Sequence, residues 1–274
     1  MKYSAWSKDV DNLLKSSSGG IFYELAKKMV ESGGKVVGVV MDGVKAKYVL
    51  SNDLDEIKKM RGSKYIPSNP SSVINEVKNC VNPILFVGLP CHINAVKKRC
   101  NTENMILCDL VCHGLPKSGI FEKHIKKISN GRNLLEVKFR DKKTGWEGDA
   151  RCQSLILKFS NGDIYDKFDD YMKNYTDNTI LLNTCKTCKN NNVGDITIGD
   201  FWGVPPALKN KLGTSIVSIN TLKGKKILNS INSITKKNVK FYHYFNIVSL
   251  KYIAFKSIYK SGLLPVIKNI GGLK

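Results

Sequence analysis

The chain has 274 residues, of which 42% are hydrophobic and 24% are charged, and this balance excludes a wholly disordered protein. No run of about 18 consecutive apolar residues occurs, and no apolar run follows the first lysine, so we expect neither a transmembrane span nor a signal peptide. We therefore expect a cytoplasmic protein. In that reducing compartment, eight cysteines indicate metal ligation or redox chemistry rather than disulfides.

The formal net charge of +21 raises the question of nucleic-acid binding. Only five of the 44 Lys and Arg residues are Arg, the residue preferred for bidentate contacts with phosphates and bases. The lysines are spread along the chain with few aromatic residues between them. This composition argues against nucleic acid as the main ligand, and an acidic partner protein or an anionic substrate fits the charge equally well.

The first 80 residues are predicted to form short strands and amphipathic helices. Apolar residues recur at i, i+3 and i+4 over residues 21–30, which is the spacing of a helix with one buried face. A run of three serines and two glycines at residues 16–20 precedes this helix. Strands are predicted over residues 3–7 and 36–40, and further helices over residues 54–60 and 71–80.

Two apolar strands, at residues 84–87 and 105–111, are each followed by a helix. This repeated order of strand, loop and helix predicts parallel neighbours joined by a right-handed crossover. Beyond residue 131 the pattern becomes one of antiparallel strands, with Asn161 and Gly162 marking a hairpin turn. The later elements are strands at 137–140, 154–159, 164–168, 195–199 and 215–220, and a helix at 223–231. The sequence therefore predicts an α/β fold: a mixed sheet with parallel βαβ units and flanking helices, an antiparallel strand region and a C-terminal helical tail.

Four of the eight cysteines stand where a group of ligands is expected. Cys185 and Cys188 form a Cys-x-x-Cys pair, and Cys91 and Cys112 each follow a buried parallel strand. Loops at the carboxyl ends of parallel strands meet at one edge of a sheet, so Cys91 and Cys112 are expected roughly 5–10 Å apart. With the Cys-x-x-Cys pair folded over this edge, four thiolates would surround one site, as in the ligand set of a [4Fe–4S] cluster.

A zinc site is the alternative, because His92 and His113 each follow one of these cysteines and could supply an imidazole. Zinc fingers and ribbons use two compact ligand pairs that are close in sequence, whereas these cysteines are scattered along the chain, which favours iron–sulfur. The two histidines are expected to support the ligands by hydrogen bonding, with a proton-donor role as the other possibility. Small hydrophobic roles are expected for Cys80, Cys100, Cys108 and Cys152.

Two further features suit an anionic ligand. The serine–glycine run at residues 16–20 offers N–H donors, hydroxyls and the positive end of a helix dipole, although a plain capped loop would have the same sequence. Arg61 and Arg140 lie in loop-like motifs. A guanidinium presents several N–H donors in a fixed planar arrangement, and a flavin pyrophosphate is one ligand that needs such donors. Surface ion pairs are the alternative for both arginines. No catalytic residue is assigned.

These residues lie in motifs that resemble the signature of the coenzyme F420 hydrogenase/dehydrogenase beta-subunit family. The matching pieces run in the family order and cover roughly residues 3–235. They are SSGGI at 17–21, RGSKY at 61–65, VGLPCH at 87–92, DLVCHG at 109–114, FRDKKTGW at 139–146, the Cys-x-x-Cys pair and DITIGDFWG at 195–203.

The resemblance implies an oxidoreductase subunit that binds FAD and one [4Fe–4S] cluster. Electrons would pass between the two, and the flavin would exchange a hydride with a deazaflavin or another organic substrate. The implied cluster ligands are Cys91, Cys112, Cys185 and Cys188, and the implied FAD contacts are Ser17, Ser18, Gly19, Gly20, Lys64 and Arg140. The implied division is an N-terminal family domain at residues 1–78, a C-terminal family domain with the iron–sulfur site at residues 79–235, and a helical tail at residues 236–274.

Many relatives carry an N-terminal ferredoxin-like segment with repeated Cys-x-x-Cys runs, and this sequence shows no such segment. We therefore expect a separate ferredoxin or another redox partner protein, together with a small organic hydride acceptor or donor. The organic substrate stays open, because many bacterial relatives occur in organisms without the deazaflavin. A second class of function also stays open, namely a non-enzymatic, zinc-stabilised basic binding protein.

Overall fold

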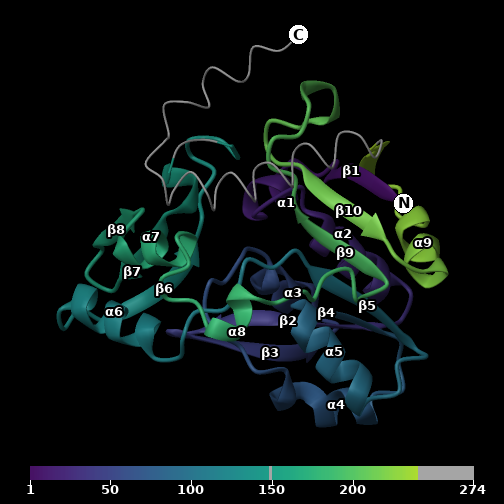
Figure 1. The fold of residues 1–274 in the computed structure, drawn as a ribbon, viewed down its shortest axis with the longest axis horizontal. Helices are drawn as coiled ribbons and strands as arrows, with labels where there is room; N and C mark the ends of the chain where they lie inside the picture. The colour runs from purple at the N-terminus through teal and green to yellow at the C-terminus, as the bar shows by residue number, and fades with distance from the viewer. Residues whose placement is uncertain (148–149, 240–274) are drawn as a thin grey trace.

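The computed structural model describes residues 1–147 and 150–239, and an eight-stranded sheet forms the centre of the fold (Figure 1). The strand order is β11-β1-β10-β9-β5-β4-β2-β3. The strands are β1 (Lys2–Ser7), β2 (Lys35–Asp42), β3 (Lys45–Ser51), β4 (Ile84–Gly88), β5 (Met105–Leu110), β9 (Ile196–Asp200), β10 (Ser215–Ile219) and β11 (Ile234–Asn238). Parallel and antiparallel pairs occur in the same sheet, so the predicted mixed α/β fold is confirmed.

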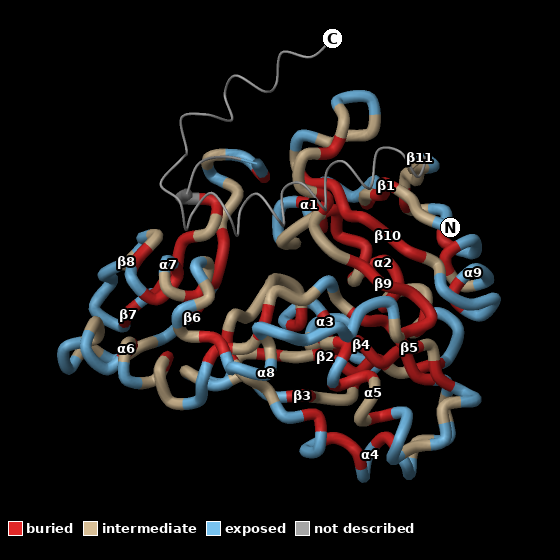
Figure 2. The backbone as a smooth tube through the Cα atoms, viewed as in Figure 1, coloured by how far each residue is buried: buried red, intermediate tan, exposed pale blue. Residues whose placement is uncertain are grey.

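The central strands β9, β5, β4 and β2 are parallel to one another, whereas the outer strands pair antiparallel. Every residue of β4 is buried, which explains why its sequence reads as one apolar run rather than as an alternation. The buried centre of the sheet is visible in Figure 2. Gly88 at the end of β4 stands opposite Asp109 in β5, so these strands end side by side at one edge.

Helices cover both faces of this sheet. Along β4, Leu85 and Val87 pack into one core with α2, α3 and α9, while Ile84 and Phe86 pack into a second core with α4 and α5. The helices on the first face are α2 (Ile21–Glu31), α3 (Leu54–Met60) and α9 (Leu222–Asn229), and those on the second are α4 (Ile74–Asn79) and α5 (Pro90–Arg99). The alternation of period two along β4 therefore places two apolar layers on opposite sides of the sheet.

A smaller antiparallel sheet follows the order β6-β7-β8 and packs beside the β2–β3 hairpin (Figure 1). Its strands are β6 (Leu134–Phe139), β7 (Leu155–Phe159) and β8 (Ile164–Lys167), and its helices are α6 (Ile120–Ser129) and α7 (Asp170–Thr176). Phe121 of α6, Phe139 of β6 and Tyr171 of α7 share a core with Ile66 from the loop after α3. This core joins the two sheets.

The large sheet contains described strands from both sides of residue 78: β1, β2 and β3 come before that residue, and β4, β5, β9, β10 and β11 come after it. In the predicted tail, residues 236–238 form the end of β11, and residues 240–274 lie outside the described residues. Within the described part of the chain, no helix combines the length and apolar character needed to cross a membrane.

Asp169 caps the N-terminus of α7, and its carboxylate connects α6, β8 and α7. Oδ1 accepts a hydrogen bond from the Met172 amide at 3.0 Å, and Oδ2 accepts from His124 Nε2 of α6 at 2.6 Å and from the Tyr165 hydroxyl of β8 at 3.0 Å. Burial on its own would raise the pKa of Asp169, but these hydrogen bonds together hold it below its ordinary value of 3.8. The carboxylate thus stabilises the smaller sheet most when it is charged.

Asp169→Asn is therefore expected to lower the free energy of unfolding by about 1–2 kcal/mol near neutral pH. The folded-state pKa is depressed, so the stabilisation is fully present above pH 3.8 and is lost as the pH falls through the folded pKa. Urea denaturation of both proteins at about pH 7 and about pH 3 tests this. A difference between the two proteins that stays constant across this range would contradict the assignment.

Candidate functional site

Four cysteines from three segments line one pocket at the carboxyl ends of β4 and β5. Cys91 lies in the first turn of α5, directly after β4, and Cys112 follows β5. Cys185 lies in the short helix α8 (Asn183–Lys186), and Cys188 follows that helix. The other lining residues are Pro90, His113, Gly114, Leu115 and Asn190. The structure thus brings together the four cysteines that strand-end placement and the Cys-x-x-Cys spacing had singled out.

Backbone pairing holds the Cys-x-x-Cys segment against the loop after β5. The Leu182 amide donates to Leu115 O at 2.8 Å, and the Lys117 amide donates to Ile180 O at 2.9 Å. Gly114 has a φ of 147°, and a Cβ there would lie 2.7 Å from Leu181 and 3.3 Å from Cys185. Only a glycine therefore allows the Cys112 loop and α8 to pack this closely.

A buried carboxylate at the end of β5 fixes the chain that follows Cys188. Asp109 is 0% exposed, and its Oδ1 accepts from the Gly194 amide at 3.0 Å and from the Thr197 hydroxyl at 2.7 Å. Its Oδ2 accepts from the Val193 amide at 3.3 Å. The Cys-x-x-Cys segment is thereby held at both ends, by Leu115 before it and by Asp109 after it.

Two thiols of the pocket are harder to ionise than a free cysteine. Burial raises the pKa of Cys112 to about 12, with a further contribution from the other three cysteines of the pocket. Burial also raises the pKa of Cys91, and Cys185 and Cys188 act on it in the same direction. A bound cation would compensate the charge and allow Cys91 and Cys112 to release their protons. Among the described residues, no three His, Cys, Asp or Glu side chains are already arranged to hold a single metal ion.

Both histidines beside the cysteines have hydrogen-bond partners. His92 is buried, and its Nδ1 shares a hydrogen bond of 2.7 Å with the Tyr48 hydroxyl. Burial lowers the pKa of His92 to about 4, so the ring is neutral near pH 7. His113 lines the pocket, and its Nε2 lies 3.2 Å from Tyr175 O. These contacts fix the orientation of the two rings, and the expected support of the cysteines by hydrogen bonding stays a prediction.

The serine–glycine loop, residues 16–20, connects α1 (Val10–Lys15) to α2 and is held tightly by its surroundings. Ser17 Oγ accepts from the Ser63 amide at 2.7 Å, and Ser18 Oγ donates to Thr214 O at 2.8 Å. A Cβ on Gly19 would lie 2.4 Å from Ala5 O and 2.8 Å from the Ser215 amide nitrogen. The loop therefore depends on glycine at residue 19, because the atoms that a side chain would meet belong to the backbone.

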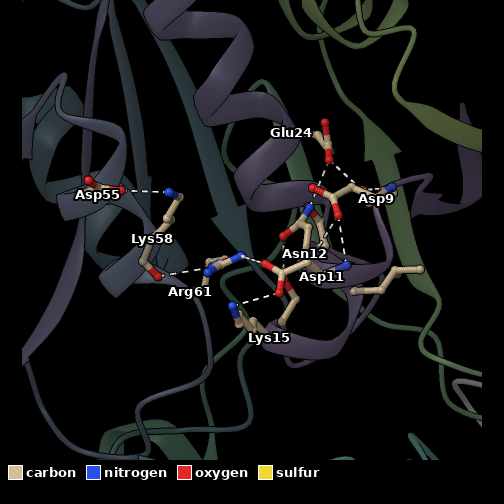
Figure 3. Close-up of polar contacts among 12 residues, drawn as sticks. Asp9, Asp11, Asn12, Lys15, Glu24, Asp55, Lys58 and Arg61 are labelled. Carbon is tan, nitrogen blue, oxygen red and sulfur yellow. Dashed lines mark hydrogen bonds and ion pairs between the residues drawn. The ribbon is translucent and has the colours of Figure 1, made fainter.

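A buried acid network fixes the position of the serine–glycine loop (Figure 3). Glu24 is 1% exposed, and its Oε1 accepts from the Ser7 hydroxyl at 2.5 Å and from Asn12 Nδ2 at 3.0 Å. Asn12 Nδ2 also donates to Gly20 O at 3.0 Å. Near the loop, the Arg61 guanidinium lies 3.8 Å from Asp11 and packs over the Tyr23 ring. The two sequence motifs that contain the loop and Arg61 thus lie side by side.

Two half-buried lysines donate to backbone carbonyls, Lys64 to those of residues 59–62 and Lys142 to those around the serine–glycine loop. The Lys64 ammonium lies 2.7–3.3 Å from the carbonyl oxygens of Lys59, Met60, Arg61 and Gly62. The Lys142 ammonium donates to the carbonyl oxygens of Leu13, Ser18 and Leu212 at 2.6–2.8 Å. Burial lowers the pKa of each lysine to about 7, while the carbonyl oxygens favour the charged form. Through these hydrogen bonds, Lys64 stabilises the loop of residues 61–65, and Lys142 connects its own loop to the serine–glycine loop.

Arg140 stands in a cluster with Asp200 and two tryptophans. Its backbone φ of 70° is uncommon for a residue other than glycine, and such conformations concentrate at functional sites. The guanidinium donates to Asp200 Oδ2 at 2.7 Å and lies over the Trp202 ring. Trp146 Nε1 donates to Asp200 Oδ1 at 3.1 Å, and its ring stacks on Trp202 with 5.0 Å between centroids. Although burial lowers the pKa of Arg140, Asp200 holds it above its ordinary value.

The loop with Lys142, the loop of residues 61–65 and the serine–glycine loop therefore meet on one side of the molecule. The half-buried Tyr65 connects Arg140 to these loops, because its hydroxyl forms a hydrogen bond with Arg140. We call this region the loop site, comprising residues 16–20, 61–65, 140–146, 200–202 and 214–215. Every FAD contact implied by the resemblance lies in it, separate from the four-cysteine pocket.

Helix α7 links the loop site to the four-cysteine pocket. The Tyr171 hydroxyl donates to Tyr65 O at 2.6 Å, and the Tyr175 hydroxyl donates to Gly114 O at 3.0 Å. The Tyr175 ring lies 4.8 Å from the Tyr65 ring and 5.2 Å from the His113 ring, measured between centroids. One helical turn therefore contacts one loop of each region and sets their relative position.

Two family models match the chain over nearly all of its described length. Both describe the "Coenzyme F420 hydrogenase/dehydrogenase, beta subunit": residues 2–75 match the model of its N-terminal part, and residues 81–240 match the model of its C-terminal part. The chain belongs to this family. The resemblance inferred from the sequence motifs is therefore confirmed, and by family the chain is part of an oxidoreductase.

A solved structure supports the same fold for this beta-subunit family member. The chain is similar to one in a structure titled "Xenon derivatization of the F420-reducing [NiFe] hydrogenase complex from Methanosarcina barkeri". The TM-score is 0.62 with 18% identity, covering 87% of this chain and 82% of the other. The comparison with curated proteins finds no significant match.

Sequence reasoning missed several residues that build this beta-subunit fold around the two regions. Lys142 lies in the FRDKKTGW motif and Asp200 in the DITIGDFWG motif, and this position was the available signal. Glu24 is a charged residue in a helix and would be expected to be solvent-exposed, but it is buried. Tyr175 gives no sequence signal, because its role arises from contacts with residues about 60 and 110 positions away.

The α7 link predicts separable effects of two similar substitutions. Tyr175→Phe removes the donor to Gly114 O and is expected to lower the free energy of unfolding by about 1–2 kcal/mol and to reduce retention of the iron–sulfur cluster that the resemblance implies for the pocket. Tyr171→Phe removes the donor to Tyr65 O and is expected instead to weaken retention of the FAD that the resemblance implies for the loop site. Iron and flavin analysis of both variants checks this. Equal losses of both cofactors in both variants would contradict a link with two separate ends.

Proposed function

We propose that this chain is an iron–sulfur flavoprotein subunit that passes electrons between a [4Fe–4S] cluster and FAD. Its flavin exchanges a hydride with a deazaflavin-like or other organic substrate. The observation that carries the proposal is the pocket lined by Cys91, Cys112, Cys185 and Cys188 in a member of this oxidoreductase family. The loop site, joined to that pocket by α7, supports a second cofactor close by.

The donor set of the pocket fits the proposed cluster. Four thiols and no carboxylate line it, and thiolates are the ligands that [4Fe–4S] clusters use. The Leu115 amide lies 3.4 Å from Cys185 Sγ, and amide donors to ligand sulfurs raise the reduction potential of such clusters. The half-buried cysteines, Cys112 and Cys185, would hold the inner side of the cluster, and the exposed Cys91 and Cys188 the outer side.

The loop site fits an anionic cofactor such as FAD. Ser17, Ser18, Gly19 and Gly20 place hydroxyls and backbone donors at the start of α2, where the helix dipole favours negative charge. Arg140 has five N–H donors, and besides its bond to Asp200 it forms a hydrogen bond with the Tyr65 hydroxyl, so it has more donors than these two partners use. When bound, the flavin supplies the conversion between a two-electron hydride and single electrons.

Lys64 contributes to this site by holding its loop. Four carbonyl oxygens already surround its ammonium, which has only three N–H donors. A direct bond from Lys64 to FAD would require release from these carbonyls and would leave them unsatisfied. We therefore assign Lys64 to the shape of the loop of residues 61–65, and direct contacts to Arg140 and the serine–glycine loop.

The partners follow from the proposed electron path. The similar structure is described as a hydrogenase complex, so it belongs to an assembly of several proteins. For this chain, we propose a separate redox protein that exchanges single electrons at the cysteine pocket and a small organic hydride donor or acceptor at the loop site. The two regions would then serve two different partners.

Electron transfer in the reconstituted protein tests this function. Protein purified and reconstituted without oxygen is mixed with reduced ferredoxin, and flavin absorbance is followed by stopped flow. We expect the flavin to be reduced in the native protein and to stay oxidised in Cys185→Ser, which removes one proposed ligand. Flavin reduction at the native rate in Cys185→Ser would contradict the proposed path. A protein that binds zinc and no flavin would support the non-enzymatic alternative instead.

A further inference from the structure

The four-cysteine pocket opens at the surface of the molecule. Cys91 and Cys188 are exposed, whereas Cys112 and Cys185 are half-buried behind them. On the inner side, Tyr175 and α7 connect the pocket to the loop site. A cluster held here would therefore have one side toward solvent and one toward the proposed flavin. A protein partner could approach the solvent side closely.

The three segments that form the pocket are basic. Residues 88–102, 110–121 and 178–194 contain six Lys and Arg residues and no Asp or Glu. All six basic side chains are exposed: Lys97, Lys98, Arg99, Lys117, Lys186 and Lys189. Lys186 and Lys189 directly follow Cys185 and Cys188, and Lys117 lies in the segment that pairs with residues 180–182. We call Lys117, Lys186 and Lys189 the basic rim.

The three lysines of the basic rim lack the acidic partners that Lys47 has in Asp42 and Lys158 has in Glu136. Other exposed lysines, such as Lys225 and Lys226, also take part in no ion pair between described residues, so position beside the four-cysteine pocket distinguishes the rim. Among the ion pairs between described residues, none involves the three lysines of the rim. Their charges are therefore available to another molecule. Nearby charges of one sign raise the rate of association with an oppositely charged partner.

Two apolar side chains lie within the same surface. Val111, which precedes Cys112, is 60% exposed, and Leu182 in the Cys-x-x-Cys segment is 37% exposed. Apolar contact area inside a charged border is the usual composition of a protein–protein interface, and electron-transfer encounters use small ones. A nucleic acid fits less well, because the rim contains no arginine and no aromatic side chain on which a base could stack.

We propose that an acidic one-electron carrier protein of the ferredoxin class docks on the basic rim and exchanges electrons with the cysteine pocket. This inference rests on the proposed function and specifies where its redox partner binds. In each encounter the carrier's cluster loses one electron and the cluster in the pocket gains it, or the reverse, and no bond or proton is transferred. Val111 and Leu182 form the apolar contact, and the three lysines form the charged border.

A charge-reversal pair with a matched control tests the docking surface. Lys186→Glu/Lys189→Glu reverses two charges on the rim, and Lys225→Glu/Lys226→Glu reverses two charges on α9, which lies away from α8 in Figure 1. Binding of an acidic ferredoxin is measured by calorimetry at low and high salt. The rate of cluster reduction is measured with reduced ferredoxin and with a reduced viologen.

The rim variant is expected to bind ferredoxin about 10–100-fold more weakly than the native protein at low salt, with most of the difference lost at high salt. The control is expected to bind within about threefold of the native protein. The rate of cluster reduction by the viologen, a cation that glutamates attract, is expected not to fall in either variant. Equal weakening in the two variants would overturn the docking surface. Tighter binding of a single-stranded oligonucleotide than of ferredoxin would overturn it too.

Failure of the docking surface is distinguishable from failure of the proposed function. Calorimetry reports docking whether or not a cluster is present, and absorbance reports the cluster whether or not ferredoxin binds. A protein that assembles a cluster but binds ferredoxin equally well in both variants contradicts the docking surface alone. A protein that assembles no cluster contradicts the proposed function, and electron exchange at the rim with it.

Discussion

Cys112→Ser is expected to abolish cluster assembly. The substitution removes one of the two half-buried proposed ligands and leaves a hydroxyl that does not replace a thiolate for iron. Loss of residues that merely support metal ligands weakens binding by about 10–100-fold, so loss of a ligand is expected to reduce iron retention by more than about 100-fold. Iron and acid-labile sulfide are measured after anaerobic reconstitution.

Cys100→Ser supplies the matched control for this variant. Cys100 is also half-buried and loses the same sulfur, but it ends α5 outside the pocket. It is expected to keep the native iron content. Equal iron in Cys112→Ser and the native protein would show that the pocket does not hold the cluster, whereas equal loss in both variants would indicate misfolding rather than ligation.

Gly19→Ala is expected to abolish flavin binding at the loop site. The new methyl group would lie 2.4 Å from Ala5 O and 2.8 Å from the Ser215 amide nitrogen, and neither backbone atom can move without shifting a strand of the large sheet. The serine–glycine loop must therefore move away from Ser63 and Lys142. Overpacking of this kind lowers the free energy of unfolding by about 1–3 kcal/mol.

Gly33→Ala separates the effect on the loop from the general effect of losing a glycine. A Cβ at Gly33 meets no atom within 4 Å, but its φ of +76° makes a side chain unfavourable by about 1–2 kcal/mol. Gly33→Ala is therefore expected to lose some stability and to retain flavin. Flavin content and the urea unfolding midpoint of both variants are measured. Native flavin content in Gly19→Ala would contradict the assignment of the serine–glycine loop.

The elements that the sequence predicts well are those whose pattern is local. The helix predicted over residues 21–30 is α2, and the apolar strands at 84–87 and 105–111 are β4 and β5. The hairpin at Asn161 and Gly162 joins β7 to β8. In each case a continuous apolar run, a helical period or a turn dipeptide carries the signal within a few residues.

The elements that escaped prediction depend on distant contacts. Strand β3 at Lys45–Ser51 is an edge strand with polar residues along half its length, and pairing with β2 gives it its conformation. Helix α7 has only seven residues, too few to show a helical period, and the Asp169 cap and the packing of Tyr171 hold it in place. Strand β11 pairs with β1 across more than 200 residues.

The sequence predicts more of the four-cysteine pocket than of the loop site. Strand-end placement correctly brings Cys91 and Cys112 to one edge, because parallel strands impose that geometry. Placing Cys185 and Cys188 there depends on the pairing of Leu182 with Leu115, which no spacing rule supplies. At the loop site, the sequence alone suggests that Lys64 is a charged side chain available to a ligand. In the structure, its ammonium donates to carbonyl oxygens of its own loop.

Cofactor analysis of the chain purified without oxygen distinguishes an iron–sulfur flavoprotein from a zinc protein. We expect about four iron and four acid-labile sulfide per chain, together with FAD that becomes fluorescent on denaturation. Zinc should be absent from the cysteine pocket. A colourless protein that contains zinc and no flavin after anaerobic iron–sulfur reconstitution would contradict the proposed function.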